Sequence, residues 1–524
     1  MDIWMTLRKA VSLYPQKIAV IDGDRSFSYS QINARTQALC RFFQSQGIGT
    51  NDRIAIIEAN THAFLEAYYA AAGLGAILLP LNYRLSPKEI ALILRDAGAR
   101  WLLVGSYFSD LMKGILAEET LLEGIVWIDE PPSISAGITT HAYEDVIQSF
   151  AGTFQPSEIQ DDQVAHLYYT SGTTGRPKGV MLTHNNVCLH ALGTIAEFKL
   201  DSTDVWGHIA PMFHLADAWA TFAITMVGGR HVMVRHFDPE VVMSTIEKER
   251  IILSNLIPTM LNLMIKHPDV KSYDFSSLRV ILSGGAPIAP ELVRSIIETF
   301  GCDYIQTYGM TETSPYLTLS ILKDHLRNLS PEAQLVYKAK TGRPFITVDL
   351  KVVDNIGLPV ASDDKQVGEI WVRGDTITPG YWNRPEETRE AFCQGWLRTG
   401  DLAVVDSEGY VNIVDRMKDM IISAGENIYS IEVENVLYLN PKVLEAAVFG
   451  VPDEKWGEAV KAAVVLKADT TASEEEIIQW CKDNLSSYKA PKSVDFISEL
   501  PKTGSGKIYK KGLREPYWTR YKNR

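Results

Sequence analysis

The feature that most constrains the fold is a regular alternation of short apolar runs with amphipathic stretches over most of the chain. The apolar runs lie at residues 53–57, 76–79, 101–104 and 278–283. The amphipathic stretches have helical periodicity and lie at residues 62–72, 89–97 and from residue 290 onward. This alternation predicts an α/β fold of βαβ units on doubly wound, mostly parallel sheets. Ligands of such sheets bind beyond the carboxyl ends of the strands, where the glycine loops of this chain fall.

The sequence changes character near residue 342, where short strands and tight turns replace the alternation. The strand patterns at residues 348–353, 368–372 and 409–413 predict a β-rich subdomain. A compact α+β pattern follows Arg416, with strands at residues 420–422, 443–449 and 460–466 and helices at 431–438 and 474–484. We therefore expect a large N-terminal domain over residues 1–416, with its β-rich subdomain at about 342–416, and a small C-terminal domain over residues 417–524.

Composition indicates a soluble protein of more than one domain. The chain has 524 residues, of which 46% are hydrophobic and 22% charged, and its net charge of −13 argues against nucleic acid or an anionic membrane as the main partner. Residues 63–81 are the most membrane-like stretch, but glycines and Pro80 interrupt them, so we expect a helix and a buried strand there and no integral membrane span. Five scattered cysteines without metal-ligand spacing, and an N-terminus without a secretory pattern, predict a cytoplasmic protein.

Residues 169–179, YTSGTTGRPKG, form the most informative local motif and directly follow an apolar run at residues 164–168. Backbone N–H groups freed by glycine can converge on an anion, hydroxyls add donors, and Lys178 adds a positive charge. These are the requirements of a polyphosphate site. The alternative is a surface turn, because Gly, Ser and Thr also cluster in turns.

Neither this loop nor a second one at residues 501–508 is a P-loop, whose pattern is G-x-x-x-x-G-K-[ST]. If Gly172 is taken as the first glycine of that pattern, the second glycine would be at position 177, where this chain has a proline. In the second loop Pro501 replaces the first glycine and Ile508 replaces the Ser or Thr that would meet magnesium.

Residues 306–313, QTYGMTET, are a further candidate for nucleotide binding. A tyrosine can stack on a purine, a threonine can donate to phosphate, and a carboxylate can hold the magnesium that bridges phosphate oxygens. The alternative is a corner between a strand and a loop, with a capping threonine and a solvated glutamate.

Three more segments carry polar side chains that suit the same ligand. Asp401, in residues 396–401, could accept hydrogen bonds from both ribose hydroxyls, although Asp beside Gly is also common in turns. Residues 415–422 hold a charge run that is otherwise typical of a hinge or helix end, and residues 423–428 otherwise indicate a turn before a helix.

In this order, the motifs resemble those of the adenylate-forming superfamily, which includes acyl- and aryl-CoA ligases, luciferases and the adenylation domains of peptide synthetases. The matching segments are residues 169–179, 308–312, 399–401, 415–427 and 501–507. The resemblance implies an ATP-dependent acyl-CoA synthetase. A carboxylic acid and ATP would give acyl-AMP and pyrophosphate, and the thiol of coenzyme A would then give acyl-CoA and AMP. It also implies Mg²⁺, a small-molecule acid as substrate, and compatibility with a homodimer.

The ATP-binding residues that the resemblance implies form the largest set. In the phosphate loop they are Thr170, Ser171, Gly172, Thr173, Thr174, Gly175 and Lys178. In the adenine slot and around the α-phosphate they are Gly284, Gly285, Ala286, Gln306, Thr307, Tyr308, Gly309, Met310 and Thr311. Asp401 and Arg416 would hold the ribose, and Glu312 with Thr170 would hold the metal.

The resemblance places the catalytic lysine at Lys507, between the carboxylate and the α-phosphate, where negative charge accumulates as the acid attacks. Without the motif set, Lys507 would be taken for a surface lysine. The resemblance further implies a mobile C-terminal domain that rotates about Lys418 and then presents Gly425, Glu426 and Trp456 to coenzyme A.

The acyl pocket implied by the resemblance contains Phe213, His214, Gly309, Met310 and Pro315, with His214 as a gate toward the thiol. The segments expected to line this pocket are residues 213–221, 257–260, 283–287 and 309–316. They are largely apolar and contain no Lys or Arg, which argues against a dicarboxylate or an amino acid as the substrate. A fatty acid and a simple aromatic acid both fit, and the fatty acid is preferred. Asp217 is the one charge outside the Glu312 motif, and the sequence leaves its orientation open.

Four alternatives remain open from the sequence. Within the superfamily they are an aromatic-acid CoA ligase, a stand-alone adenylation enzyme that loads a carrier protein, and a luciferase-type oxygenase. From a different class comes a nucleotide-binding scaffold without activity. The scaffold needs no lysine at the reacting centre, so the joint presence of Lys507, Glu312 and the ribose pair argues against it.

Overall fold

The computed structural model describes residues 1–118, 120–132, 137–171, 177–285, 288–502 and 508–522. The chain is divided into two compact units. The first comprises Met1–Asp349 and Val372–Leu397, and the second comprises Leu350–Trp371 and Arg398–Arg524. In the described ranges no helix is long and apolar enough to cross a membrane.

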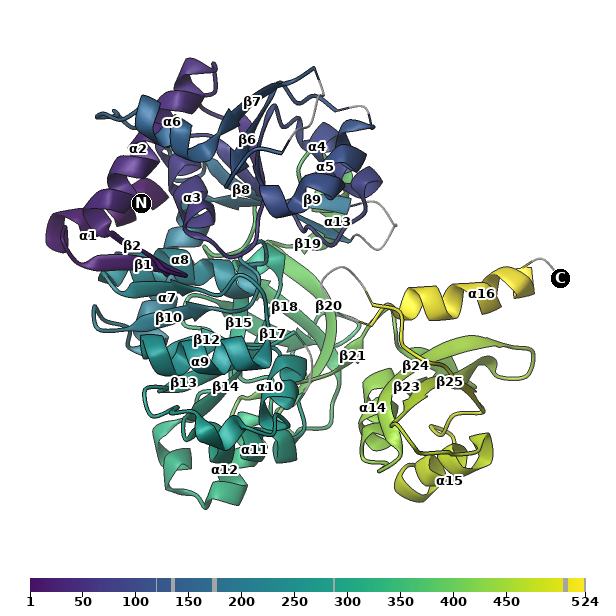
Figure 1. The fold of residues 1–524 in the computed structure, drawn as a ribbon. Coiled ribbons are helices and arrows are strands. Elements are labelled where there is room, and N and C mark those ends of the chain that lie inside the picture. Colours follow the sequence, from purple (N-terminus) through teal and green to yellow (C-terminus); the bar gives the residue numbers. More distant parts are fainter. Residues whose placement is uncertain (119, 133–136, 172–176, 286–287, 503–507, 523–524) are drawn as a thin grey trace. The chain divides into compact units, whose positions relative to one another are not determined.

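A seven-stranded sheet lies in the first unit, and the strands before and after the first predicted glycine loop, β8 and β9, end its strand order (Figure 1). Its strands, in spatial order, are β7 (Thr139–Ala142), β6 (Gly124–Ile128), β5 (Trp101–Gly105), β3 (Arg53–Ile57), β4 (Ile77–Pro80), β8 (Val164–Ser171) and β9 (Pro177–Thr183). The accompanying helices are α2 (Tyr29–Ser45), α3 (His62–Leu74), α4 (Pro87–Ala97), α5 (Ser109–Leu116) and α6 (Tyr143–Ser149). All neighbours pair in parallel except β8 and β9, which form an antiparallel pair.

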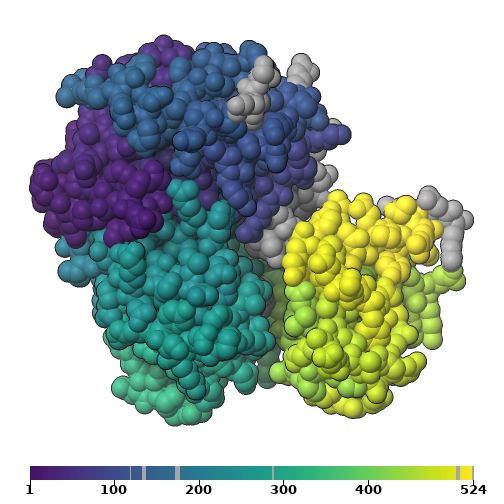
Figure 2. Space-filling model, in the orientation of Figure 1, coloured from purple at the N-terminus to yellow at the C-terminus, as the bar shows by residue number. Residues whose placement is uncertain are grey.

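A nine-stranded sheet forms the other half of the first unit. Its strands, in spatial order, are β16 (Arg343–Pro344), β15 (Tyr316–Leu319), β14 (Asp303–Gly309), β13 (Val280–Gly284), β12 (Leu253–Asn255), β10 (Val205–His208), β11 (Arg230–Met233), β1 (Ile18–Asp22) and β2 (Arg25–Ser28). Its helices are α1 (Ile3–Leu13), α7 (His184–Phe198), α8 (Leu215–Val227), α9 (Pro239–Glu249), α10 (Pro258–Ile265), α11 (Pro290–Phe300) and α12 (Pro331–Lys338). In the space-filling view the residues of this unit, coloured from purple to teal, form one continuous body (Figure 2).

Helix caps explain why several of these helices begin where they do. Ser28 begins α2 and Ser86 begins α4 with capping boxes, each accepting from the backbone three residues later while Gln31 or Glu89 bonds back. Gly98 ends α4 in a left-handed conformation with φ of 68°, which glycine adopts without strain. The Ser-x-x-Glu and terminal Gly pattern thus fixes α4 from the sequence alone.

A five-stranded sheet follows the nine-stranded one in sequence. It consists of β17 (Asp349–Val353), β18 (Gly368–Arg373), β20 (Trp396–Val405), β19 (Phe392–Cys393) and, paired with β20, β21 (Val411–Arg416), and it is accompanied by α13 (Pro385–Ala391). This is the predicted β-rich subdomain.

The C-terminal part of the second unit is the predicted α+β structure. Its strands are β23 (Glu426–Ile428), β22 (Ile421–Ser423), β25 (Gly457–Leu466), β24 (Val443–Asp453) and, beside β25, β26 (Ser493–Phe496). Its helices are α14 (Ser430–Tyr438), α15 (Glu474–Asn484) and α16 (Lys510–Lys522). A core of buried aliphatic side chains from α14, α15 and the long strands holds it together. The predicted α/β fold with a small α+β part is confirmed; the boundary at residues 416 and 417 stays a prediction.

Candidate active site

The predicted phosphate loop connects two strands that pair with one another. In the β8–β9 ladder, Thr170 lies opposite Lys178 and Ser171 lies opposite Pro177. The ladder therefore holds the two ends of the loop side by side, with a hydroxyl and an ammonium at its base. Gly172, Thr173, Thr174 and Gly175 lie outside the described residues, as does the side chain of Ser171.

Tyr381 links the lysine of this loop to the predicted metal ligand. The ammonium of Lys178 lies 5.3 Å from the centre of the Tyr381 ring, and the Tyr381 hydroxyl donates to Glu312 Oε1 at 2.9 Å. Burial, followed by the negative charge of Glu312, raises the pKa of Tyr381, so the phenol stays protonated and remains a donor. Sequence reasoning missed this residue, although a bulky aromatic pair directly after Pro379 and Gly380 was a usable signal.

The segment that carries Tyr381 also ties the surrounding elements together. The backbone N–H of Thr378 donates to Glu312 O at 2.8 Å, and the Thr378 hydroxyl donates to Met181 O at 2.6 Å. The N–H of Trp382 donates to Gly179 O at 2.8 Å. Strand β9 and the short 3₁₀ turn Thr311–Thr313 are thus held by one segment, which brings the predicted residues Lys178, Thr311 and Glu312 into a common neighbourhood.

The predicted adenine slot lies at the carboxyl ends of β13 and β14. Gly284 pairs with Thr307, and a Cβ at position 284 would lie 2.4 Å from the Thr307 hydroxyl oxygen and 2.6 Å from its carbonyl oxygen. Only glycine fits there. Gln306, Thr307 and Tyr308 follow on β14, Gly285 has a φ of 84°, and Ala286 lies outside the described residues.

Gly309, Met310 and Pro315 are brought together by the turn between β14 and β15. The N–H of Met310 donates to Pro315 O at 3.1 Å, and a Cβ on Gly309 would lie 1.9 Å from the same oxygen. Three of the predicted acyl-pocket residues therefore form one tight structure.

The other two, Phe213 and His214, lie where β10 leads into α8. The rings of Phe213 and Tyr83 pack edge to face, with their centres 4.9 Å apart. His214 caps α8, because its Nδ1 accepts the N–H of Ala216. Asp217 is fully buried, and its carboxylate accepts from Trp206 Nε1 at 3.2 Å and bonds His208 Nδ1 at 2.5 Å. The side chain of Asp217, whose orientation the sequence left open, thus points toward β10.

A cavity of about 410 Å³ lies beside this connection. Its lining consists of Asn60, Tyr83, Arg84, Ile209, Pro211, Arg235, His236, Phe237, Ile257, Thr259, Met260 and Leu263. One wall is apolar and includes residues of the predicted pocket segment 257–260. The two arginines were not anticipated, because they belong to other segments; Arg235 lies 3.5 Å from carboxylate oxygens of both Asp22 and Asp129.

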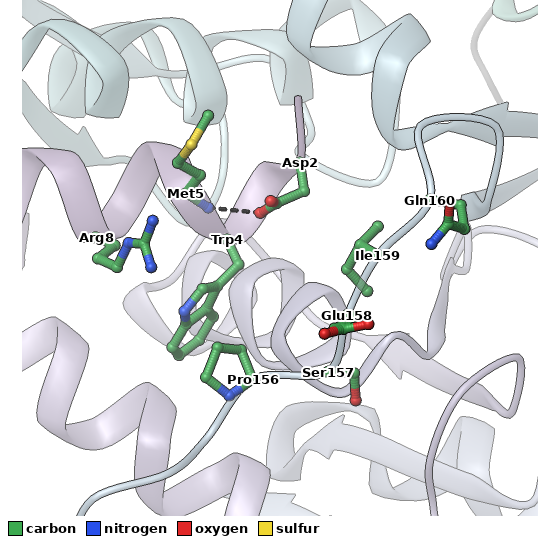
Figure 3. A pocket seen from close by; sticks show the side chains of 9 residues that line it. All are labelled: Asp2, Trp4, Met5, Arg8, Pro156, Ser157, Glu158, Ile159 and Gln160. Carbon is green, nitrogen blue, oxygen red and sulfur yellow. Dashed lines mark hydrogen bonds between the residues drawn. The ribbon is translucent and has the colours of Figure 1, made fainter.

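A second cavity, of about 420 Å³, lies near the N-terminus and carries none of the predicted site residues (Figure 3). Its lining mixes apolar and polar side chains from the start of α1 and from residues 156–160, and Asp2 accepts the N–H of Met5 there as the cap of α1 (Figure 3).

The predicted ribose pair is a direct contact within the second unit. Asp401 and Arg416 are opposite one another in the β20–β21 ladder, and Arg416 Nε lies 3.1 Å from Asp401 Oδ1. Asp401 is buried, whereas the side chain of its partner Arg416 is half-exposed.

Lys418 lies in the short connection between β21 and β22, an element end of the kind that a hinge requires. Its carbonyl accepts from Arg514 Nη1 at 2.9 Å, and burial lowers the pKa of its ammonium, with Arg416 contributing in the same direction.

The predicted coenzyme A residues also lie together. Gly425 and Glu426 belong to the β22–β23 hairpin, and the N–H of Ala424 at its turn donates to Trp456 O at 2.8 Å. The Trp456 side chain is 39% exposed, enough to offer a face to a ligand. Lys507 lies outside the described residues; Lys502 and Ile508, on either side of its loop, form an antiparallel bridge.

The donor set around Glu312 suits magnesium better than a metal held by protein alone. In the part of the chain that the structure describes, no group of three or more His, Cys, Asp or Glu could hold an ion. Mg²⁺ is commonly bound by one or two carboxylates together with substrate phosphates and water, which is what one buried glutamate beside a phosphate loop provides.

Comparison with known proteins identifies the family. The chain matches the family described as AMP-binding enzyme over residues 7–382 and its C-terminal domain over residues 432–507. It therefore belongs to the AMP-binding enzymes, the adenylate-forming superfamily, and is an acid–thiol ligase of the acyl- and aryl-CoA synthetase type.

Its relatives differ in the acids for which they are named. The chain is 37% identical to a feruloyl-CoA synthase of an Amycolatopsis species, over 98% of both chains. It is 36% identical to a long-chain-fatty-acid–CoA ligase of Thermus thermophilus, over 99% of this chain and 96% of that one. The crystal structure of the anthranilate CoA ligase AuaEII with anthranoyl-AMP superposes with a TM-score of 0.89 at 27% identity, covering 99% and 98% of the two chains.

Proposed function

We propose that this protein activates an apolar monocarboxylic acid, preferably a fatty acid, as the acyl-adenylate and transfers the acyl group to coenzyme A. The observation that carries the proposal is the linked set of Lys178, Tyr381 and Glu312 at the base of the phosphate loop. This set joins an ammonium, a phenol and a carboxylate, which are groups that suit a nucleotide polyphosphate and its magnesium.

In the first step the carboxylate attacks the α-phosphorus of ATP, and pyrophosphate leaves. Lys178 balances the charge of the departing phosphates, and Thr311 contacts the α-phosphate. Glu312 with Thr170 would hold Mg²⁺, which would neutralise charge on the phosphates. Asp401 and Arg416 hold the ribose, while Gly284 and its neighbours leave room for the base. Lys507 stabilises the charge that develops between the two reacting groups.

In the second step the thiol attacks the acyl carbon and AMP leaves. Rotation about Lys418 withdraws Lys507 and presents the Gly425, Glu426 and Trp456 face, with His214 as the gate. The rotation and the boundary of the moving part at residue 417 both belong to the proposal.

The preference for a fatty acid rests on the apolar wall of the 410 Å³ cavity, in which Ile257 and Met260 belong to a predicted pocket segment. The second candidate is an aromatic acid. The relative named feruloyl-CoA synthase and the structural neighbour with bound anthranoyl-AMP favour it.

The test is a panel of acids assayed for pyrophosphate release with and without coenzyme A. Short- to long-chain fatty acids, hydroxycinnamates and substituted benzoates belong to it, with a dicarboxylate to probe the two cavity arginines. Release with a fatty acid together with acyl-CoA formation supports the proposal, and release with aromatic acids alone favours the second candidate. Release without any acyl-CoA indicates a carrier-loading enzyme, and no release with any acid indicates a scaffold.

A further inference from the structure

Asp217 belongs to a chain of buried polar side chains that the reaction described above does not use. His208 bonds Asp217 through Nδ1 at 2.5 Å, its Nε2 lies 3.0 Å from His231 Nδ1, and His231 Nε2 lies 3.0 Å from the Thr225 hydroxyl. Asp217, His208 and His231 are all fully buried. The chain runs from the first turn of α8, through β10 and β11, back to the last turn of α8.

The polarity of this chain follows from burial. Burial, with a smaller contribution from His208, lowers the pKa of His231, so His231 is neutral and has one ring N–H. With that N–H on Nδ1, His231 donates to His208 Nε2 and accepts from the Thr225 hydroxyl at Nε2, while the ring N–H of His208 on Nδ1 faces Asp217. A buried carboxylate without such a partner would be costly, and removal of one partner from a buried pair is strongly destabilising.

The turn that Asp217 fixes is the turn that holds His214. The carbonyl of His214 accepts the N–H groups of Asp217 and Ala218, both at 3.1 Å, and its Nδ1 accepts the N–H of Ala216 at 3.2 Å. The carbonyl of Ala216 in turn accepts from Asn255 Nδ2 at 2.9 Å. The side chains of Asp217 and Asn255 thus fix the first turn of α8, and this turn holds the imidazole of His214.

We propose that Asp217 is a positioning residue that fixes the imidazole of His214 through the buried chain with His208 and His231, and that it neither contacts the acid nor selects it. The inference rests on the proposed function of His214 as the gate for the thiol. It assigns to Asp217 an effect on thioester formation alone, because adenylation takes place before the thiol approaches.

The experiment compares two half-reactions in the full-length protein: pyrophosphate release with ATP and acid, and acyl-CoA formation from preformed acyl-AMP. The variants are Asp217→Asn, His214→Ala, the double variant, and Asp324→Asn as an exposed control. We expect Asp217→Asn to slow thioester formation on the order of tenfold to a hundredfold, as displacement of a positioned group does. Pyrophosphate release and the order of preferred acids stay unchanged, and the control equals the wild type.

The decisive comparison is the double variant. Because Asp217 acts through His214, Asp217→Asn has no further effect once His214 is alanine. Additive losses, equal loss in both half-reactions, a changed order of acids or no loss at all would overturn the inference. If Asp217→Asn does not fold, His208→Gln, alone and with His214→Ala, replaces it in the same comparison. A wild-type protein without either half-reaction contradicts the proposed function instead.

Discussion

At the scale of single residues, two hydrogen bonds from one distant segment fix Glu312. Glu312 receives a hydrogen bond from the Tyr381 hydroxyl, and its own backbone carbonyl is fixed by the N–H of Thr378. Both contacts come from a segment far away in sequence. In the proposed role of Glu312 as the magnesium ligand, these contacts orient the carboxylate in advance and reduce the reorganisation that the reaction requires.

Tyr381→Phe tests this contact. Loss of a hydrogen bond to a charged group costs about 1.5–3 kcal/mol, so we expect pyrophosphate release to slow about tenfold to a hundredfold and to require more Mg²⁺. Steady-state kinetics over a magnesium series measure the effect, and Tyr107→Phe, at a side chain that is 78% exposed, is the control. An unchanged magnesium dependence would show that Tyr381 does not act through Glu312.

Gly309→Ala tests the tight turn of the acyl pocket. The added Cβ would lie 1.9 Å from Pro315 O, so backbone must move, at a cost of about 1–3 kcal/mol or more. We expect a lower midpoint of thermal unfolding and a higher KM for the acid. Gly49→Ala is the control, because a Cβ there meets nothing within 4 Å. A variant as stable and active as this control would contradict the assigned geometry.

At the scale of elements, β1 and α3 are joined by a buried ion pair between Asp22 and His62, with Nδ1 and Oδ2 2.6 Å apart. Burial lowers the pKa of His62, but its bonds to Asp22 and Glu144 outweigh burial and raise it overall. Burial likewise raises the pKa of Asp22, but the bond and charge of His62 outweigh it and lower it overall. The pair connects a strand of the nine-stranded sheet to a helix of the other half.

These shifts give the pair a pH window. Because the pKa of His62 is raised in the folded protein, its contribution is fully present below its unfolded value of about 6.5 and is lost as pH rises through the folded value. Because the pKa of Asp22 is lowered, its contribution is present above about 4 and is lost as pH falls through the folded value. The pair stabilises most between these limits.

We therefore expect His62→Gln to lower the midpoint of thermal unfolding more at pH 6 than at pH 8.5. Loss of one partner of a buried pair costs about 3–5 kcal/mol where the pair is charged. The control is His325→Gln, at an exposed histidine. An equal or larger loss at the higher pH would contradict the charged pair.

The elements themselves were largely predictable from the sequence, because local signals agree with the fold. The predicted strand at residues 53–57 is β3, and the helix predicted from residue 290 is α11, which begins with a proline and ends at a glycine. Tyr381, Asn60 and Arg235 were not predictable, because each reaches its site through a non-local contact. The role of Asp217 was hidden for the same reason: His208 and His231 meet it only once β10, β11 and α8 are packed.

At the scale of the whole molecule, the proposed function draws residues from both units of the chain for each half-reaction. Lys178, Glu312 and His214 belong to the first unit, whereas Asp401, Arg416, Lys418 and the coenzyme A face belong to the second. A chain that needs Lys507 for one step and another face of the same unit for the next must alternate between two arrangements.

Lys507→Ala tests this alternation. We expect it to abolish acyl-AMP formation, since the loss of one transition-state contact costs on the order of a hundredfold or more, and largely to spare acyl-CoA formation from preformed acyl-AMP. Single-turnover assays of each half-reaction measure this, with Lys511→Ala as the neighbouring control. Equal loss of both half-reactions would contradict the alternation.

The central claim is that the acid is activated as its adenylate, and the fate of its oxygen tests this most directly. The acid is labelled with ¹⁸O in both carboxyl oxygens, incubated with ATP, Mg²⁺ and coenzyme A, and the AMP is analysed by mass spectrometry. Because the carboxylate attacks the α-phosphorus and that oxygen stays with AMP when the thiol displaces it, the account predicts one ¹⁸O atom in each AMP formed. Formation of acyl-CoA with unlabelled AMP, or with ADP and labelled inorganic phosphate, would contradict the account.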